Sequence, residues 1–318
     1  MNDAFNVVRR FDAILQTTED ATIKQIFQAL ATSYANMEDN LRRSHDKYLA
    51  TSKPYLTGLQ RSALLLQEIE ELLNLVPPRV AATLEAGVNE LINQASQNGS
   101  SMALELIGTI APNTIILPST VPVEALKSAV SDAMSWLTGT GTEFKTAAKQ
   151  VIAQGLIQNK GIPWTTGVLR RNLGISKRNA ESIARTATLQ ATDQATREAY
   201  ETNAIGYVQQ VSAEDERVCG FCAFRCGNIY RLDEVSAILH VRCRCYLMPV
   251  KAEWLRDGLV DLEWMRSHHA TTAAIAKTPL NPGLVQFERS RGLTSPATPL
   301  WTPNGGFQDD EFARMSSG

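Results

Sequence analysis

Apolar residues in the first hundred positions recur at steps of three and four. This spacing places them on one face of a helix, and three such stripes predict three amphipathic helices that pack into a bundle. Pro77 and Pro78 separate the second helix from the third, because proline stops a helix but fits the first turn of the next one. The stripes consist of Ile23, Ile26 or Phe27, Leu30, Tyr34, Met37 and Leu41, then Leu56, Leu59, Ala63, Leu66, Ile69 and Leu73, and finally Val80, Leu84, Val88, Leu91 and Ala95.

Turn-forming residues interrupt this pattern. The stretch "NGSS" at 98–101 predicts a boundary, and "TIAPNTIILPSTVP" at 109–122 predicts a linker. Pro122 suits the first turn of a helix through "VEALKSAVSDAMSWL", and the "GTGTE" that follows predicts the next break. We therefore expect an N-terminal helical region at 1–110 and a linker with one helix at 111–142.

The helical pattern returns from residue 143 to residue 203 and ends in a stripe of small residues. Small side chains let two helix backbones approach closely, so this helix is expected to pack tightly against a neighbour. Alanine is also the best helix former, and this simpler explanation of the stripe stays open. The stripe consists of Ala180, Ala184, Ala187, Ala191, Ala195 and Ala199.

After Gly206 the sequence becomes typical of β-strands. The stretches "YVQQV", "GNIYRL" and "CRCYLMPV" predict a small β module. From residue 270 onward, five of the 13 prolines fall in a region with little periodicity, which predicts an extended tail. The expected anchors of this tail are Phe287, Leu300, Trp301 and Phe307.

The composition is that of a folded protein without a dominant charge. Hydrophobic residues make up 44% of the chain and charged residues 20%, which permits a packed core. The formal net charge is −2, so binding to nucleic acid or to an anionic membrane would require a local basic patch. We recognise no secretory signal and no apolar run near the roughly 20 residues of a membrane span. A chain that is made and folds in a reducing cytoplasm, with no membrane partner, is expected.

All five cysteines lie in one window that ends at Cys245. A C-x2-C pair, Cys219 and Cys222, is followed after 17 residues by His240 and then by Cys243 in an H-x2-C pair. Two short pairs of soft or borderline ligands match the tetrahedral coordination of zinc. Cys243 and Cys245 would face the same side of an extended strand, so either can be the fourth ligand.

Other uses of clustered cysteines fit this window less well. A disulfide framework requires an oxidising compartment, and five cysteines leave one unpaired. A thioredoxin-like C-x-x-C opens a helix, whereas β-like sequence follows this one. A zinc deaminase needs H-x-E upstream of its cysteines, and a catalytic zinc keeps one position open for water. These comparisons favour a closed, structural zinc site, with Cys226 as a spare thiol.

A structural metal would supply folding energy to a segment of roughly 45 residues with few large apolar groups. Arg242 and Arg244 flank the cysteines and could offset the negative charge of a thiolate centre, although strand alternation would instead place them in solvent. We find no nucleophile with a neighbouring base, and His45, His268 and His269 are expected at the surface. Neither enzyme activity nor a small-molecule substrate is therefore expected.

The region before and within the cysteine window resembles a known family. "IART", an alanine-rich stretch, a strand, "DER" before C-x-x-C, a glycine-aromatic turn and a closing "HVRCRC" follow one another in this order. This order is similar to the head-morphogenesis domain of tailed bacteriophages, the minor head protein family that includes the F protein of phage Mu. The resemblance covers roughly residues 145 to 250.

The resemblance implies a minor capsid protein of the virion, made in the host cytoplasm and located in the head near the portal vertex. Implied partners are the portal protein and the major capsid protein of the same phage, with possible contact to packaged DNA. The expected fold is mainly α, with a small zinc-stapled β module and an extended tail. We expect the head-morphogenesis domain at 143–252, with helices at 143–205 and the Cys/His module at 206–252, and a short helix and tail at 253–318.

An alternative function is DNA binding. "VLRRNLGISKRNAESIART" at 168–186 resembles a helix-turn-helix, with Gly174 in the turn and Ser176 as the cap of a second helix. A basic patch without acids accompanies it and could bind phosphates. An ordinary helical hairpin with a solvated basic face explains the same residues. The patch consists of Lys160, Arg170, Arg171, Lys177 and Arg178.

Overall fold

The computed structural model describes most of the chain, with several gaps. The described residues are 1–46, 67, 76–119, 121, 127, 130–131, 134–135, 139, 142–143, 146–151, 154, 158, 162–212, 214, 218–238, 243–276 and 298–317. All six residues of the predicted stripe from Leu56 to Leu73 lie outside them. So do His240 and Arg242, and within some helices the side chains are not described.

The chain divides into two compact units that interleave along the sequence. One unit comprises residues 1–18, 92–129 and 186–318, and the other comprises 19–91 and 130–185. Three long helices contribute to both: α1 (Asn2–His45), α3 (Val76–Ile110) and α5 (Ile162–Thr202). The domain boundaries expected from the sequence stay predictions, because these units follow spatial packing and not chain order.

The helices predicted around the first and third apolar stripes are confirmed by α1 and α3. The boundary predicted at "NGSS" is wrong, because α3 continues through these residues to Ile110. The linker predicted after this helix is found as irregular chain at 111–119. Asn203 holds this segment: its side-chain amide accepts a hydrogen bond from the Leu117 nitrogen (2.7 Å) and donates one to the Leu117 carbonyl (3.0 Å).

Gly99 lies inside α3 because the backbones of α3 and α5 approach closely there. A Cβ atom at Gly99 would meet the Thr192 carbonyl oxygen at 2.4 Å, far inside van der Waals contact. The hydroxyl of Thr192 donates to the Ala95 carbonyl (3.3 Å), and that of Thr196 donates to the Gly99 carbonyl (3.2 Å). Glycine is therefore needed at this position for packing, and not to end the helix.

The small-residue stripe of α5 is buried, as expected for a helix that packs tightly on a neighbour. Its members with described side chains are Ala184, Ala187, Ala191, Ala195 and Ala199, and each is at most 5% exposed. The high helix propensity of alanine does not by itself explain why all five of these residues are buried.

The helix-turn-helix predicted at 168–186 is wrong. Residues 162–202 form one continuous helix, and Gly174 lies within it with nothing near the position of a Cβ atom. A glycine inside a helix costs only about 1 kcal/mol relative to alanine, so the surrounding good helix formers carry the helix through it.

The β module predicted after Gly206 is confirmed as part of a five-stranded antiparallel sheet with the order β3-β1-β2-β4-β5. The strand bounds are Tyr207–Ser212 for β1, Ile229–Arg231 for β2, Cys245–Val250 for β3, Trp301–Thr302 for β4 and Gly306–Phe307 for β5. Shorter helical elements surround the sheet: α6 (Gly220–Arg225), the 3-10 turn η2 (Leu232–Glu234), α7 (Ala252–Arg256), α8 (Leu262–Ile275) and α10 (Asp310–Ser317). The first unit is thus a sheet packed with helices, in a chain that is mainly helical.

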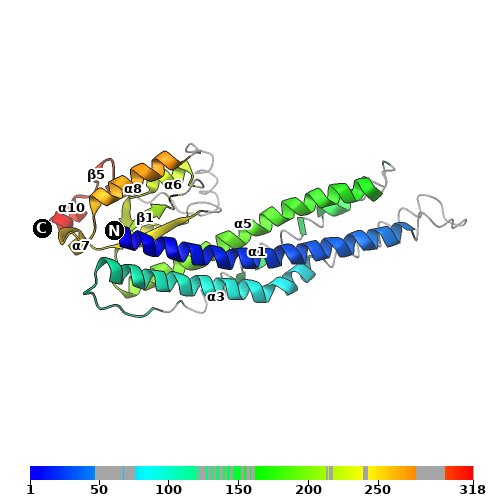
Figure 1. The fold of residues 1–318 in the computed structure, drawn as a ribbon, viewed down its shortest axis with the longest axis horizontal. Helices are drawn as coiled ribbons and strands as arrows, with labels where there is room; N and C mark the ends of the chain where they lie inside the picture. The colour runs from blue at the N-terminus through cyan, green and yellow to red at the C-terminus, as the bar shows by residue number, and fades with distance from the viewer. Residues whose placement is uncertain are drawn as a thin grey trace, which may run out of the picture. The chain divides into compact units, whose positions relative to one another are not determined.

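The core of the sheet unit joins segments from both ends of the chain. In Figure 1 the N-terminal end of α1 lies beside β1 and α8. The sheet, α3, the end of α5 and the C-terminal elements share the same buried cluster. Its members include Phe5, Val8, Met102, Leu106, Tyr200, Val208, Ile229, Leu247, Trp254, Trp301 and Phe312.

The described part of the expected tail, residues 298–317, is folded and not extended. Trp301 pairs with Ile229 in the sheet, and the ring of Phe312 on α10 packs 4.7 Å from that of Tyr207. The anchors expected at Leu300 and Trp301 are confirmed as 5% and 1% exposed, whereas Phe307 is exposed and Phe287 lies outside the described residues. Two-residue strands carry no periodicity, so the pairing of β4 with β2 and of β5 with β4 could not be read from the local sequence.

The second unit is helical where it is described. Its buried side chains come from α1, α3, α5 and a helical segment at 146–151, and they include Ile23, Ile26, Val88, Leu91, Ala148, Val151 and Leu169. Arg185 on α5 donates to Glu181 of its own helix and to Glu19 and Asp20 of α1, each at 3.2 Å.

Among the helices that the structure describes, none combines the length and the apolar character that a membrane crossing requires.

Replacement of Gly99 by alanine is expected to lower the free energy of unfolding by about 1–3 kcal/mol, because the backbones of α3 and α5 must move apart. The matched control is Gly174→Ala in α5, where nothing lies near the new methyl group. This control is expected to raise the free energy of unfolding by about 0.5–1 kcal/mol. Urea unfolding followed by circular dichroism measures both variants, and equal effects of the two would contradict the close contact at Gly99.

Candidate metal centre

The C-x-x-C pair spans the N-terminus of the short helix α6. Cys219 is the N-cap residue with extended backbone (φ −88°, ψ 159°), and its sulfur accepts a hydrogen bond from the Cys222 nitrogen at 3.4 Å. Cys222 lies in the first turn, and the turn glycine Gly227 (φ +87°) then leads the chain into β2. The expectation that β-like sequence, and not a helix, follows this pair is therefore wrong. With six residues, α6 is too short to show in the sequence the apolar spacing that predicts a helix.

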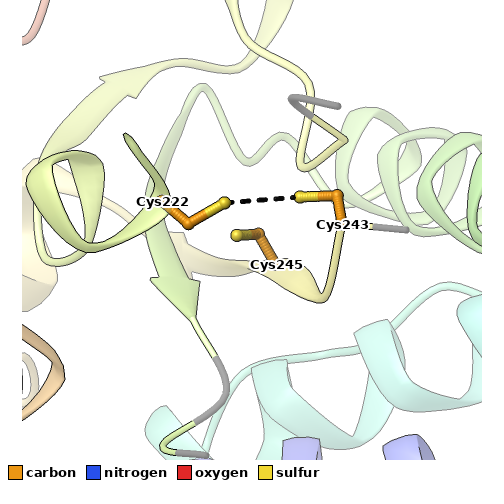
Figure 2. A group of neighbouring side chains, drawn as sticks. All are labelled: Cys222, Cys243 and Cys245. Atoms are coloured by element: carbon orange, nitrogen blue, oxygen red, sulfur yellow. Dashed lines mark hydrogen bonds between the residues drawn. The ribbon is translucent and has the colours of Figure 1, made fainter. Parts of the chain in front are cut away.

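Three cysteine sulfurs from two segments meet at this point. Cys245 is the first residue of β3, and Cys243 lies two positions before it. The ligand atoms of Cys222, Cys243 and Cys245 all lie within 4.8 Å of one another, and the sulfurs of Cys222 and Cys243 are 3.7 Å apart. Figure 2 shows the three side chains pointing toward one another. We call this group the three-cysteine cluster.

The cluster is buried beside the end of β1. Cys222, Cys243 and Cys245 are 3%, 1% and 3% exposed. Ser212, the last residue of β1, pairs with Cys245 in the sheet; its hydroxyl donates to the Cys222 carbonyl (3.2 Å) and lies 3.4 Å from the Cys245 sulfur. Three elements, β1, α6 and β3, therefore fix the positions of the three thiols.

The thiols share protons unevenly. The pKa of Cys222 is raised well above its ordinary value by hydrogen bonds with Cys219, Cys243 and Cys245, and burial adds to this. The pKa of Cys245 is lowered well below its ordinary value, because Cys222 and Cys243 donate hydrogen bonds to its sulfur. The protonation of each thiol therefore depends on its neighbours. A metal ion that binds thiolates would replace these shared protons.

Asp193 of α5 binds a short segment that contacts the Cys243 sulfur. Its carboxylate accepts hydrogen bonds from the Ser236 hydroxyl (2.9 Å) and from the Ala237 nitrogen (3.2 Å), and the Cys243 sulfur donates to the Ala237 carbonyl (3.5 Å). Burial raises the pKa of Asp193, which the nearby Arg197 opposes. Asp193 was not among the residues predicted for the site. The one feature that distinguishes it in the sequence is its position as an acidic residue next to the small-residue stripe.

The structure brings together three of the five predicted metal ligands. Cys219 caps α6 next to Cys222, and its role as a ligand stays a prediction, as does that of His240. All five cysteines are free of disulfides. Cys226, expected as a spare, is fully buried and is not one of the three clustered thiols, and its sulfur donates to the Thr272 hydroxyl at 3.6 Å.

The Arg244 side chain is largely buried, and it forms an ion pair with Asp12. Its Nη2 atom donates to both carboxylate oxygens of Asp12 on α1, at 2.6 and 2.7 Å, and the Tyr246 hydroxyl also donates to Asp12. The side chains of Asp12 and Arg244 are 17% and 14% exposed. The prediction that Arg244 alternates into solvent is wrong, because α1 covers this side of β3.

The expectation that His268 lies at the surface is also wrong. His268 on α8 is 3% exposed, stacks on Trp264 (centroids 4.8 Å apart, planes at 7°) and contacts Glu214 through Nδ1 at 2.7 Å. Burial lowers its pKa, and Glu214 opposes this effect. His269 is partly buried, with Nδ1 2.7 Å from the Cys226 carbonyl, and the side chain of His45 is not described.

The predicted basic patch is only partly within the described residues. Arg170, Arg171 and Arg178 lie at exposed positions of α5, whereas Lys160 and the side chain of Lys177 are not described. Phosphate binding by this patch stays a prediction.

Comparison with known proteins matches part of the chain to a family. Residues 130–248 match the family described as "Phage Mu protein F like protein". The resemblance found in the sequence is thereby confirmed, and the matched segment includes every cysteine of the chain. No curated protein and no solved structure matches the chain.

Replacement of Asp193 by asparagine is expected to change how stability depends on pH. A carboxyl whose pKa is raised by folding binds its proton more tightly in the folded state, so stability falls as pH rises from the unfolded value of 3.8 through the raised value. Asparagine has no carboxyl that titrates. The free energy of unfolding of the variant is therefore expected to fall less than that of the parent over this pH range, by on the order of 1 kcal/mol. Urea unfolding of both proteins between about pH 4 and about pH 7 measures the difference. Parallel pH profiles would contradict it.

Proposed function

We propose that this chain, whose residues 130–248 match the phage Mu protein F like family, is a minor head protein of a tailed bacteriophage. The match carries the proposal, because it covers the whole of α5, the strands β1 and β2, and the whole cysteine window. We further propose a structural role in head assembly near the portal vertex, with the portal protein and the major capsid protein as partners. The role is one of contact and not of catalysis.

We propose in addition that the three-cysteine cluster binds one structural zinc ion. Tetrahedral thiolate ligands at about 2.3 Å from zinc lie about 3.8 Å from one another. The 3.7 Å separation of the Cys222 and Cys243 sulfurs agrees with this edge length and is far longer than a disulfide bond of about 2.05 Å. Three thiolates favour zinc over hard cations such as magnesium or calcium. Cys219 or His240 would supply the fourth ligand.

The position of the cluster in the fold supports a structural and not a catalytic metal. The three cysteines are at most 3% exposed, whereas a catalytic zinc keeps an open position for water and substrate. In the described part of the segment between β1 and β3, the regular elements are six residues of α-helix, three of strand and one 3-10 turn. A metal bound at both ends of this segment stabilises it more than such short elements do by themselves.

The metal is tested by replacement of single cysteines. Cys222→Ser is expected to lower bound zinc from about one ion per chain to near zero, since it removes the thiol that the α6 segment contributes to the cluster. Cys226→Ser is the matched control, because Cys226 is equally buried but bonds to Thr272. Elemental analysis of purified chains after dialysis measures the metal content. A parent chain that folds without metal, or equal metal loss in both variants, would contradict the site.

The head-protein role is tested by the composition of particles. The chain is expected in purified virions at a few copies per particle, which quantitative mass spectrometry of the intact phage measures against the major capsid protein. Phage that lack the chain are expected to give few infectious particles, with infectivity restored by the parent gene supplied in trans. Absence of the chain from mature heads and from proheads, together with normal infectivity without it, would refute the role.

A further inference from the structure

The N-terminal helix reaches the loop that carries two of the clustered thiols. Arg244 stands between Cys243 and Cys245 in the sequence, and its guanidinium donates to both oxygens of Asp12, 232 positions earlier in the chain. Tyr246, one residue beyond Cys245, donates its hydroxyl to the same carboxylate. One acidic residue of α1 therefore binds side chains on both flanks of Cys245.

This ion pair is largely withdrawn from water. With Asp12 and Arg244 only 17% and 14% exposed, removal of either charge leaves the other buried without its partner. The pair forms only when the backbone of residues 243–245 holds Arg244 toward α1. The same backbone places the sulfurs of Cys243 and Cys245 toward Cys222.

Further contacts attach the same end of α1 to the elements around the cluster. Arg9 pairs with Glu214, just after β1, at 3.2 Å, and the Trp264 ring nitrogen donates to the Asn2 side chain at 2.7 Å. The ring of Phe5 packs edge-on to His268, with centroids 4.6 Å apart. The first three turns of α1 are thus docked on the β module, and Asp12 connects this docking to the cysteine loop.

We propose that metal binding at the three-cysteine cluster and docking of the N-terminal end of α1 are thermodynamically linked through Asp12 and Arg244. The inference rests on the proposed metal site. A bound ion fixes residues 243–245, which orients Arg244 and Tyr246 for Asp12, and the docked helix in turn holds the thiols in the geometry that binds the ion. By reciprocity, each event strengthens the other by the same factor. Asp12 is a positioning residue for the metal centre.

The test uses the full chain and zinc ions with a competing chelator of known affinity. Asp12→Asn keeps the size of the side chain and removes its charge, and it is expected to weaken zinc binding about 10-fold, as is usual for residues that orient metal ligands. Tyr246→Phe removes one hydrogen bond and is expected to weaken zinc binding by a smaller factor. Glu105→Gln is the matched control, because Glu105 on α3 pairs with Arg10 of the same N-terminal helix, away from the cysteines. This control is expected to leave zinc affinity unchanged within about twofold.

Hydrogen exchange gives a second measurement, made on the parent chain and on Asp12→Asn. Zinc is expected to slow amide exchange in residues 2–12 of the parent chain as well as in residues 243–250, and Asp12→Asn is expected to abolish the effect on residues 2–12. If zinc binds, but Asp12→Asn binds it as tightly as the parent and exchange in residues 2–12 ignores zinc, the linkage is refuted. If the parent chain binds no zinc at all, the metal site itself is refuted and the linkage falls with it.

Discussion

The approach of three buried sulfur atoms determines how the sheet unit is organised. Cys222 and Cys243 are 21 positions apart, yet their sulfurs lie 3.7 Å from each other. Each belongs to a different segment, so the meeting point fixes where α6 begins and where β3 begins, while Ser212 marks the end of β1. Burial disfavours thiolates, so any negative charge on these sulfurs would have to be compensated by hydrogen bonds or by a bound cation.

A second constraint comes from the close packing of α3 and α5. Small residues on both helices bring the backbones together at Gly99 and Thr192, and threonine hydroxyls use the short distance to bond carbonyls of the other helix. The same helix α5 carries Asp193, which accepts hydrogen bonds from Ser236 and Ala237. The packing against α3 and the support of the thiols therefore both depend on α5. A shift of α5 along α3 would displace the support of the cluster.

The features that depend on local patterns could be predicted from the sequence. The apolar steps of α1 and α3, the small-residue stripe of α5 and the strand-like stretches after Gly206 all carry periodicity, and each is found. The spacing of cysteine and histidine was enough to locate the candidate site, and three of its thiols converge. The errors arise where tertiary contacts override local signals. Glycine at 99 looks like a helix end although the neighbouring backbone requires it there, and glycine at 174 looks like a turn although the helix absorbs it.

Partners far apart in the chain were beyond local reasoning. Nothing near Arg244 in the sequence indicates that Asp12 would bind it, and nothing near His268 indicates Glu214 and Phe5 as its neighbours. Single charged or aromatic side chains carry no period, and their burial depends on which distant segment covers them. The pairing of Trp301 with Ile229 is of the same kind.

The sheet order has a consequence for synthesis of the protein on the ribosome. The central strands β1 and β2 emerge long before β4, which pairs with β2, and before Phe312, which packs on Tyr207. Helices with local contacts can form as they leave the exit tunnel, whereas this unit combines the earliest and the latest residues of the chain. Nascent chains must therefore wait with the β4 side of β2 unpaired until residues 301–302 have left the ribosome, which makes chaperone protection most valuable during that interval.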